Sequence, residues 1–114
     1  MRGKIVQVPH GLAVVLAVSS QGAAIVPITV GPRTRRAASV IEVQADGLGT
    51  CAVYCGRAAV YQGALGETPY SVSDDTVETL HDAVQRAHET RAIERRYKIT
   101  PRFRRGADYR AVNF

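Results

Sequence analysis

Three side chains of this sequence could take part in acid–base chemistry at a phosphoryl group. His10 carries an imidazole, the side chain whose charge changes most readily near neutral pH. Tyr54 could donate a hydrogen bond or stack on a base, and Arg57, three positions later, could supply a cation that stabilises a charged phosphate. Each also has a purely structural interpretation: a turn histidine, an aromatic on a sheet face and a solvated arginine at a strand end.

The positive charge of the chain is concentrated at its C-terminal end. The 114 residues carry a formal net charge of +5. Residues 1–90 are close to neutral, whereas residues 91–114 hold eight Lys or Arg against Glu94 and Asp108. Tyr97, Phe103 and Tyr109 lie among these basic residues and could stack on bases, so the segment predicts contact with nucleic acid. A solvated helix end followed by a soluble tail is the alternative.

Short runs typical of β-strands make up the chain as far as residue 62, and turn-forming residues separate them. Pro27 interrupts the third run, which favours an edge position or a bulge for that strand. Strands at this spacing, with short Gly/Pro turns, predict a small barrel or a curled antiparallel sheet. The expected strands cover residues 5–8, 12–18, 23–30, 39–43, 50–55 and 58–62.

One amphipathic helix is expected after these strands. Ser73 is a suitable N-cap, and the two acids that follow it favour the positive end of the helix dipole. The helix is expected to run to about Tyr97, with Pro101 as a stop. Its apolar stripe consists of Val77, Leu80, Val84 and Ala87. The chain is therefore predicted to be an α+β protein, with one domain over residues 1–98 and a basic tail over residues 99–114.

The two cysteines, Cys51 and Cys55, are expected to be buried thiols. On one strand they would lie about 13 Å apart, too far for a disulfide between them. No histidine is close to them in sequence, so a zinc site is not expected. The longest apolar stretch, residues 12–18, is too short to span a bilayer, and the chain is expected to be cytoplasmic.

Several stretches of the chain, in order, resemble the MazF/Kid/PemK family of bacterial toxins. The segment Val53-Tyr54-Cys55-Gly56-Arg57 occupies the place where members of that family commonly carry Arg-Cys-Asp-Gln. The other matching stretches are Arg2-Gly3-Lys4-Ile5-Val6, residues 12–19, Ile25-Val26-Pro27-Ile28-Thr29, and Leu65-Gly66-Glu67 with residues 72–76.

This resemblance implies a small SH3-like antiparallel β-barrel with a C-terminal helix, which forms a homodimer and is bound by an antitoxin protein. It also implies cleavage of single-stranded RNA without a metal or cofactor. In such a site His10, Tyr54 and Arg57 would be catalytic. The residues expected to bind RNA are Thr29, which matches the family's strand-end threonine, together with Arg33, Arg35, Arg36, Arg102, Arg104 and Arg105.

The sequence also departs from the family at its active site. Tyr54 and Gly56 replace the Arg and Asp that help to cleave RNA, and Pro9-His10-Gly11 replaces a long loop that covers the site. Two functions therefore stay open. The chain is either an endoribonuclease with a rearranged site, or an inactive relative that binds nucleic acid or a protein. For the homodimer, residues 23–30 are apolar enough to supply the contact surface.

The basic tail generates a first prediction. If it neutralises about four phosphates of a single strand, log affinity should fall with log salt at a slope of roughly −3. A chain that ends at residue 98 should bind single-stranded RNA more weakly and with a flatter slope, as measured by anisotropy across a salt series. Unchanged affinity and slope in the shortened chain would contradict a role for the tail in binding.

Overall fold

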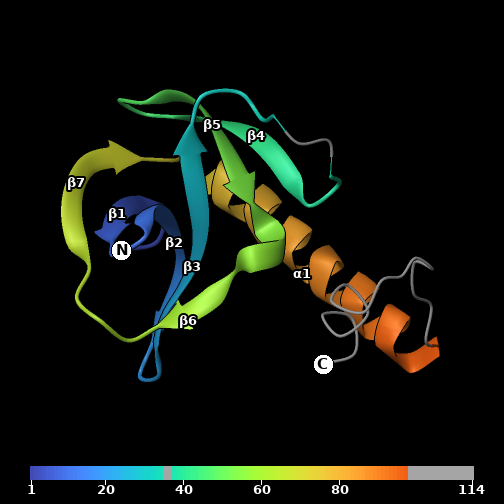
Figure 1. Cartoon of the computed structure of the whole chain (residues 1–114). Helices are drawn as coiled ribbons and strands as arrows, with labels where there is room; N and C mark the ends of the chain where they lie inside the picture. The colour runs from blue at the N-terminus through green and yellow to red at the C-terminus, as the bar shows by residue number, and fades with distance from the viewer. Residues whose placement is uncertain (35–36, 98–114) are drawn as a thin grey trace.

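A computed structural model of the chain describes residues 1–34 and 37–97 (Figure 1). One long helix, α1 (Asp74–Tyr97), follows seven strands. The strands are β1 (Lys4–Val8), β2 (Gly11–Ser19), β3 (Gly22–Val30), β4 (Val40–Ala45), β5 (Gly49–Tyr54), β6 (Ala59–Tyr61) and β7 (Gly66–Ser71), and a short 3₁₀-helix, η1 (Cys55–Arg57), joins β5 to β6. The predicted α+β class is confirmed.

All seven strands belong to one curled antiparallel sheet. Its order is β4-β5-β3-β2-β1-β7, and β6 lies beside β3. The sheet is not closed into a barrel by a continuous ladder. A single bridge links its two ends, where the Asp46 N–H donates a 2.7 Å hydrogen bond to the carbonyl oxygen of Ser71.

The position of Pro27 differs from the expectation, because β3 is a central strand and not an edge. β2 pairs along one side of β3. On the other side β6 pairs with residues 23–25 and β5 with residues 28–30, so Val26 and Pro27 lie between the two paired segments. A proline is tolerated there because it has no N–H that needs a ladder partner. β3 thus has strands along both of its edges, and the expectation that segment 23–30 is a free sheet edge for the dimer is wrong, whereas the homodimer itself stays a prediction.

The edge proline of the sheet is Pro69, in a strand that the sequence analysis missed. β7 ends the sheet beside β1 and carries a polar, glycine- and proline-containing sequence. β7 is the last strand in the sheet order, and an edge strand tolerates polar residues, Gly and Pro. Its sequence therefore lacks the pattern of a buried strand. Tertiary pairing with β1 makes it a strand.

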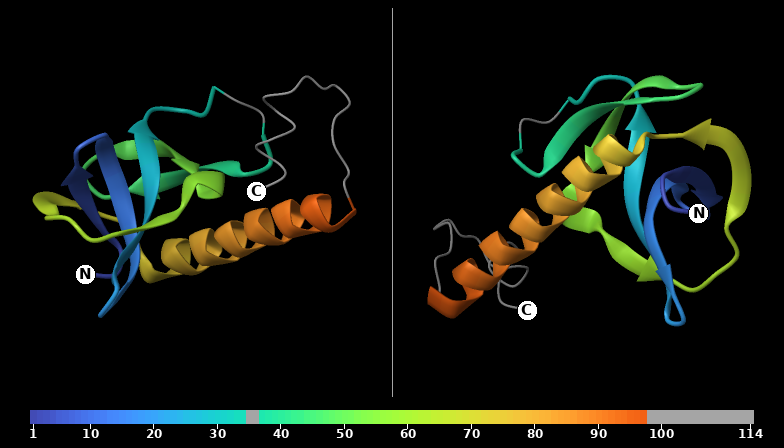
Figure 2. Two further views of the ribbon diagram at one scale, coloured as in Figure 1. Left: turned by 60° about the horizontal axis from the view of Figure 1, so that its bottom comes forward. Right: turned by 180° about the vertical axis from the view of Figure 1, so that it is seen from behind.

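Helix α1 begins where the sequence predicts and is described as far as Tyr97, whereas Pro101, its expected stop, and the basic tail lie outside the described residues. The Ser73 side chain accepts a 3.2 Å hydrogen bond from the Thr76 N–H, which is the expected N-cap. Val77, Leu80 and Ala83 are buried against the sheet, and Val84 packs at the rim of the same cluster. Figure 2 shows α1 crossing one face of the sheet, with its last turns extending beyond the strands.

The sheet buries side chains on both of its faces. Val14 and Leu16 of β2 face α1 in the main core, with Cys51, Val53 and Cys55. The alternate residues Ala13 and Val15 face a smaller cluster on the opposite side, with Val6, Ala23 and Ile25. This second face is the one that carries the candidate site.

Gly3 joins the sheet to the start of α1. Its N–H donates to the Val15 carbonyl and its carbonyl accepts from the Val72 N–H, both at 2.8 Å. Gly3 has φ +86°, and a Cβ there would lie 2.9 Å from the Val72 carbonyl oxygen. A side chain is therefore excluded both by backbone conformation and by contact.

We predict that Gly3→Ala destabilises the fold more than Gly49→Ala. Gly49 has a similar φ of +77°, but no atom lies within 4 Å of the place that a Cβ would occupy there. The left-handed conformation should cost each variant roughly 1–2 kcal/mol. Gly3→Ala should lose further stability because the contact with Val72 must open. Urea unfolding measures both, and equal losses would contradict a steric role for the contact.

Candidate functional site

His10 and Arg57, two of the side chains selected from the sequence, line the same cavity. It has a volume of about 220 Å³. Apolar side chains form most of its wall, and His10, Arg57 and Tyr61 are its polar members. The remaining lining residues are Val8, Pro9, Leu12, Ala13, Ile25, Pro27, Ala59 and Val60.

A tight hairpin turn positions His10. Val8 pairs with Gly11, so Pro9 and His10 alone form the turn between β1 and β2. The Gln7 side chain braces this turn, because its Nε2 donates to the carbonyl oxygens of both Val8 and Gly11 at 3.2 Å. The imidazole is thus carried by a short, braced turn and not by a long loop.

The 3₁₀-helix η1 positions Arg57. Cys55, at its start, is 1% exposed in the main core, and its N–H donates a 2.8 Å hydrogen bond to the Ser39 carbonyl. Arg57, at its end, is exposed and lines the cavity. Burial of the first residue therefore fixes where the last one emerges.

Thr29 and Tyr54 form a second polar group near the cavity. Their hydroxyl oxygens are 3.1 Å apart, within hydrogen-bond distance. Thr29 lies two residues after Pro27 on β3, and alternate residues of a strand share a face. Thr29 therefore lies on the cavity face of the sheet, with its Cα roughly 6.6 Å further along β3 than that of Pro27, but neither Thr29 nor Tyr54 lines the cavity itself.

Arg33 takes part in the fold and does not line the cavity. Its guanidinium donates to the Val40 carbonyl at 2.8 Å, and its N–H donates to Glu42 Oε2 at 2.8 Å. These bonds attach the segment after β3 to β4. The other arginines expected to bind RNA, namely Arg35, Arg36, Arg102, Arg104 and Arg105, lie outside the described residues.

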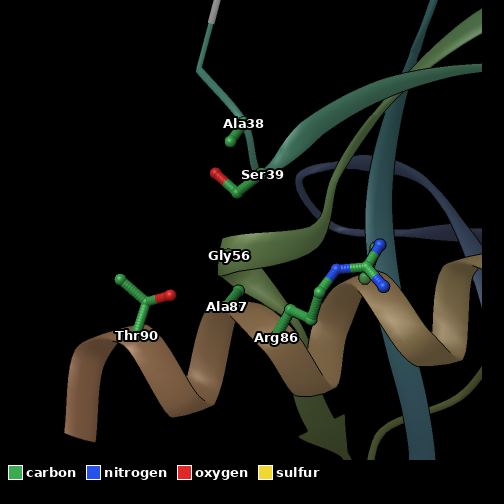
Figure 3. A pocket seen from close by; sticks show the side chains of 7 residues that line it. Ala38, Ser39, Gly56, Arg86, Ala87 and Thr90 are labelled. Atoms are coloured by element: carbon green, nitrogen blue, oxygen red, sulfur yellow. The ribbon is translucent and has the colours of Figure 1, made fainter. Parts of the chain in front are cut away.

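A second pocket, of about 410 Å³, lies between α1, η1 and the segment before β4. Figure 3 shows Ala38 and Ser39 opposite Ala87 and Thr90 of α1, and Arg86 extending along the helix away from Thr90. Gly56, at the place of the family's usual Asp, and Ala87 of the predicted helix stripe line this pocket, but none of the described residues expected to be catalytic or to bind RNA does. The cavity with His10 and Arg57 is therefore the better candidate for chemistry.

Both cysteines are buried and form no disulfide, as predicted. Burial raises the pKa of the Cys55 thiol to about 11, and the nearby Arg86 charge opposes this shift only partly. Burial also raises the pKa of Cys51. These thiols are therefore poor nucleophiles near neutral pH, and both side chains pack in the core.

The raised pKa of Cys55 predicts a loss of stability at high pH. Below about pH 9 the thiol is neutral in both states and its burial stabilises the fold. Between about pH 9 and 11 the unfolded chain loses this proton while the folded chain keeps it, so the free energy of unfolding should fall. Urea unfolding across this pH range should show a smaller fall in Cys55→Ala than in the unchanged chain. Equal falls would contradict the assignment to Cys55.

The structure brings together His10 and Arg57 in one cavity, with Thr29 and Tyr54 on the same face of the sheet. Tyr61 also lines the cavity, and its place beside Val60 in a short apolar run was the one signal for it in the sequence.

Among residues 1–34 and 37–97, no three His, Cys, Asp or Glu side chains form a group able to hold a metal ion. The same residues include no helix long and apolar enough to cross a membrane. Known protein families, curated proteins and solved structures give no match to the chain.

Proposed function

We propose that this protein is a toxin-type endoribonuclease that cleaves single-stranded RNA without a metal ion and acts in the cytoplasm. The observation that supports this most strongly is that His10 and Arg57 line one cavity although they are far apart in the sequence. A proton-transfer group and a fixed cation are two of the requirements for RNA cleavage. The hydroxyl pair of Thr29 and Tyr54 supplies further donors on the same face.

The proposed reaction is a transesterification within the RNA. His10 takes the proton of a 2′-hydroxyl, and the 2′-oxygen attacks the adjacent phosphorus. The bond from phosphorus to the 5′-oxygen breaks, and Tyr54 provides the proton for that leaving oxygen. Arg57 stabilises the additional negative charge on the phosphorane. The products are a 2′,3′-cyclic phosphate and a 5′-hydroxyl.

The wider features implied by the family resemblance belong to this proposal. They are an SH3-like barrel, a homodimer and an antitoxin partner. The curled antiparallel sheet with one C-terminal helix is compatible with such a fold. Since β3 is central, its backbone edges cannot form the dimer contact, and the exposed side chains of Val18, Val30 and Val60 are candidates instead.

The alternative is an inactive relative that binds RNA, DNA or a protein. The mostly apolar wall of the cavity favours this alternative, because such a wall binds a ring or an aliphatic group and performs no chemistry. Incubation of a long RNA with the purified chain in the presence of EDTA distinguishes the two. Discrete fragments support the nuclease, and binding without fragments supports the inactive relative.

We expect His10→Ala and Arg57→Ala each to lower the cleavage rate by about 10²- to 10⁴-fold, because each removes a group that acts in the transition state. Tyr54→Phe should also slow cleavage, since it removes the proposed proton donor. His81→Ala and Arg2→Ala are matched controls. Neither residue lines the cavity. His81 is exposed on α1, and Arg2 forms an ion pair with Glu78.

Rates should be measured with a fluorescent RNA, and the products analysed for the cyclic phosphate. Unchanged rates in both His10→Ala and Arg57→Ala would exclude the proposed site. Loss of activity on addition of EDTA would exclude the metal-free reaction, whatever the variants show.

A further inference from the structure

We propose that the cavity lined by His10 and Arg57 is a pocket for one unpaired nucleobase of the RNA. The inference rests on the proposed function and adds a ligand to the same site. Ala13, Ile25 and Pro27 contribute apolar wall from β2 and β3. His10 and Arg57 enter from the β1–β2 turn and from η1.

The size of the cavity suits a single base. Its volume is about 220 Å³. An apolar cavity of about 150 Å³ is known to hold one benzene molecule, so this one has room for the ring of a base. The wall has few polar groups. A base whose ring faces pack against this wall therefore leaves few buried donors or acceptors unpaired.

Two features of the wall favour a flat ring over an aliphatic group. Tyr61 of β6 offers an aromatic ring, and bases stack on such rings regardless of their sequence. Pro27 lies where β3 has no strand beside it on one edge, between the segments paired with β6 and β5. Pro27 is half-buried and lines the cavity, so its ring offers a flat apolar surface there.

The charge of the lining favours a nucleic acid over a peptide side chain. His10 and Arg57 are the basic members of the lining, and among the described residues no acidic one lines the cavity. A base that enters the pocket brings its phosphate to the rim, where Arg57 is exposed. The hydroxyls of Thr29 on β3 and Tyr54 on β5 can then bond to the adjoining nucleotide. The pocket should discriminate weakly between bases, because its wall offers few groups that distinguish one base edge from another.

The test compares two oligonucleotides on the full-length chain. One is a short 2′-O-methyl oligouridine, which lacks the nucleophile and is not cleaved, and the other is the same backbone without bases. The first should bind about 5- to 150-fold more tightly, the range expected for stacking of one base. Fluorescence anisotropy measures both affinities.

Matched variants assign this preference to the cavity. Ala59→Leu fills the cavity from an exposed position on β6, whereas Ala64→Leu adds the same side chain at an exposed site outside the lining. We expect Ala64→Leu to keep the preference for the base-bearing strand and Ala59→Leu to lose most of it. Tyr61→Phe should keep it as well, because the aromatic ring stays.

Several outcomes would overturn the inference. Equal binding of the two oligonucleotides by the unchanged chain is one, and an equal preference in Ala59→Leu and Ala64→Leu is another. If the chain nevertheless cleaves RNA, the nuclease stands and the base pocket alone is excluded. If it neither binds nor cleaves single-stranded RNA, the proposed function is excluded too. A further outcome concerns chemical modification of the Tyr61 ring. If phenylalaninamide protects the ring from modification and neither oligonucleotide does, the cavity belongs to a protein partner instead.

Discussion

The divided pairing of β3 is the constraint on which the candidate site depends. One edge of β3 pairs with β2, and its other edge is shared between β6 and β5. The chain must therefore leave β5 and enter β6 within a few residues, and η1 makes that connection. Pro27 occupies the place between the two paired segments without leaving a backbone donor unsatisfied. Arg57 emerges beside this place because Cys55, two residues earlier, is held in the core.

The hairpin of β1 and β2 contributes His10 to the site. β2 pairs with both β1 and β3, so the register of these three strands determines where the turn with His10 lies. The site is thus built from a tight turn and a short helical connection on a paired scaffold. Such elements hold side chains in defined positions better than long loops do. Because Pro9 and His10 alone form that turn, the β1–β2 connection adds no long loop to this face.

The two faces of the sheet have different roles. Because side chains alternate along a strand, Val14 and Leu16 contact the core under α1, whereas Ala13 and Val15 support the other face. This explains why β2 is apolar almost throughout. Helix α1 packs on one face (Figure 2), and the cavity with His10 and Arg57 lies on the other. Cys51 and Cys55 belong to the first face, which is why they have no part in the proposed chemistry.

The sequence by itself determined the helix and strands that depend on residues close together in the chain. The period of α1, its Ser73 cap and the six apolar strands could all be predicted, because each depends on neighbours within a few residues. It also singled out His10, Tyr54 and Arg57 by side-chain chemistry. Only the tertiary structure decided that β3 is central, that the polar segment 66–71 is a strand, and that His10 and Arg57 share a cavity. These features depend on pairing between residues distant in the sequence, and the pattern within one segment does not carry that information.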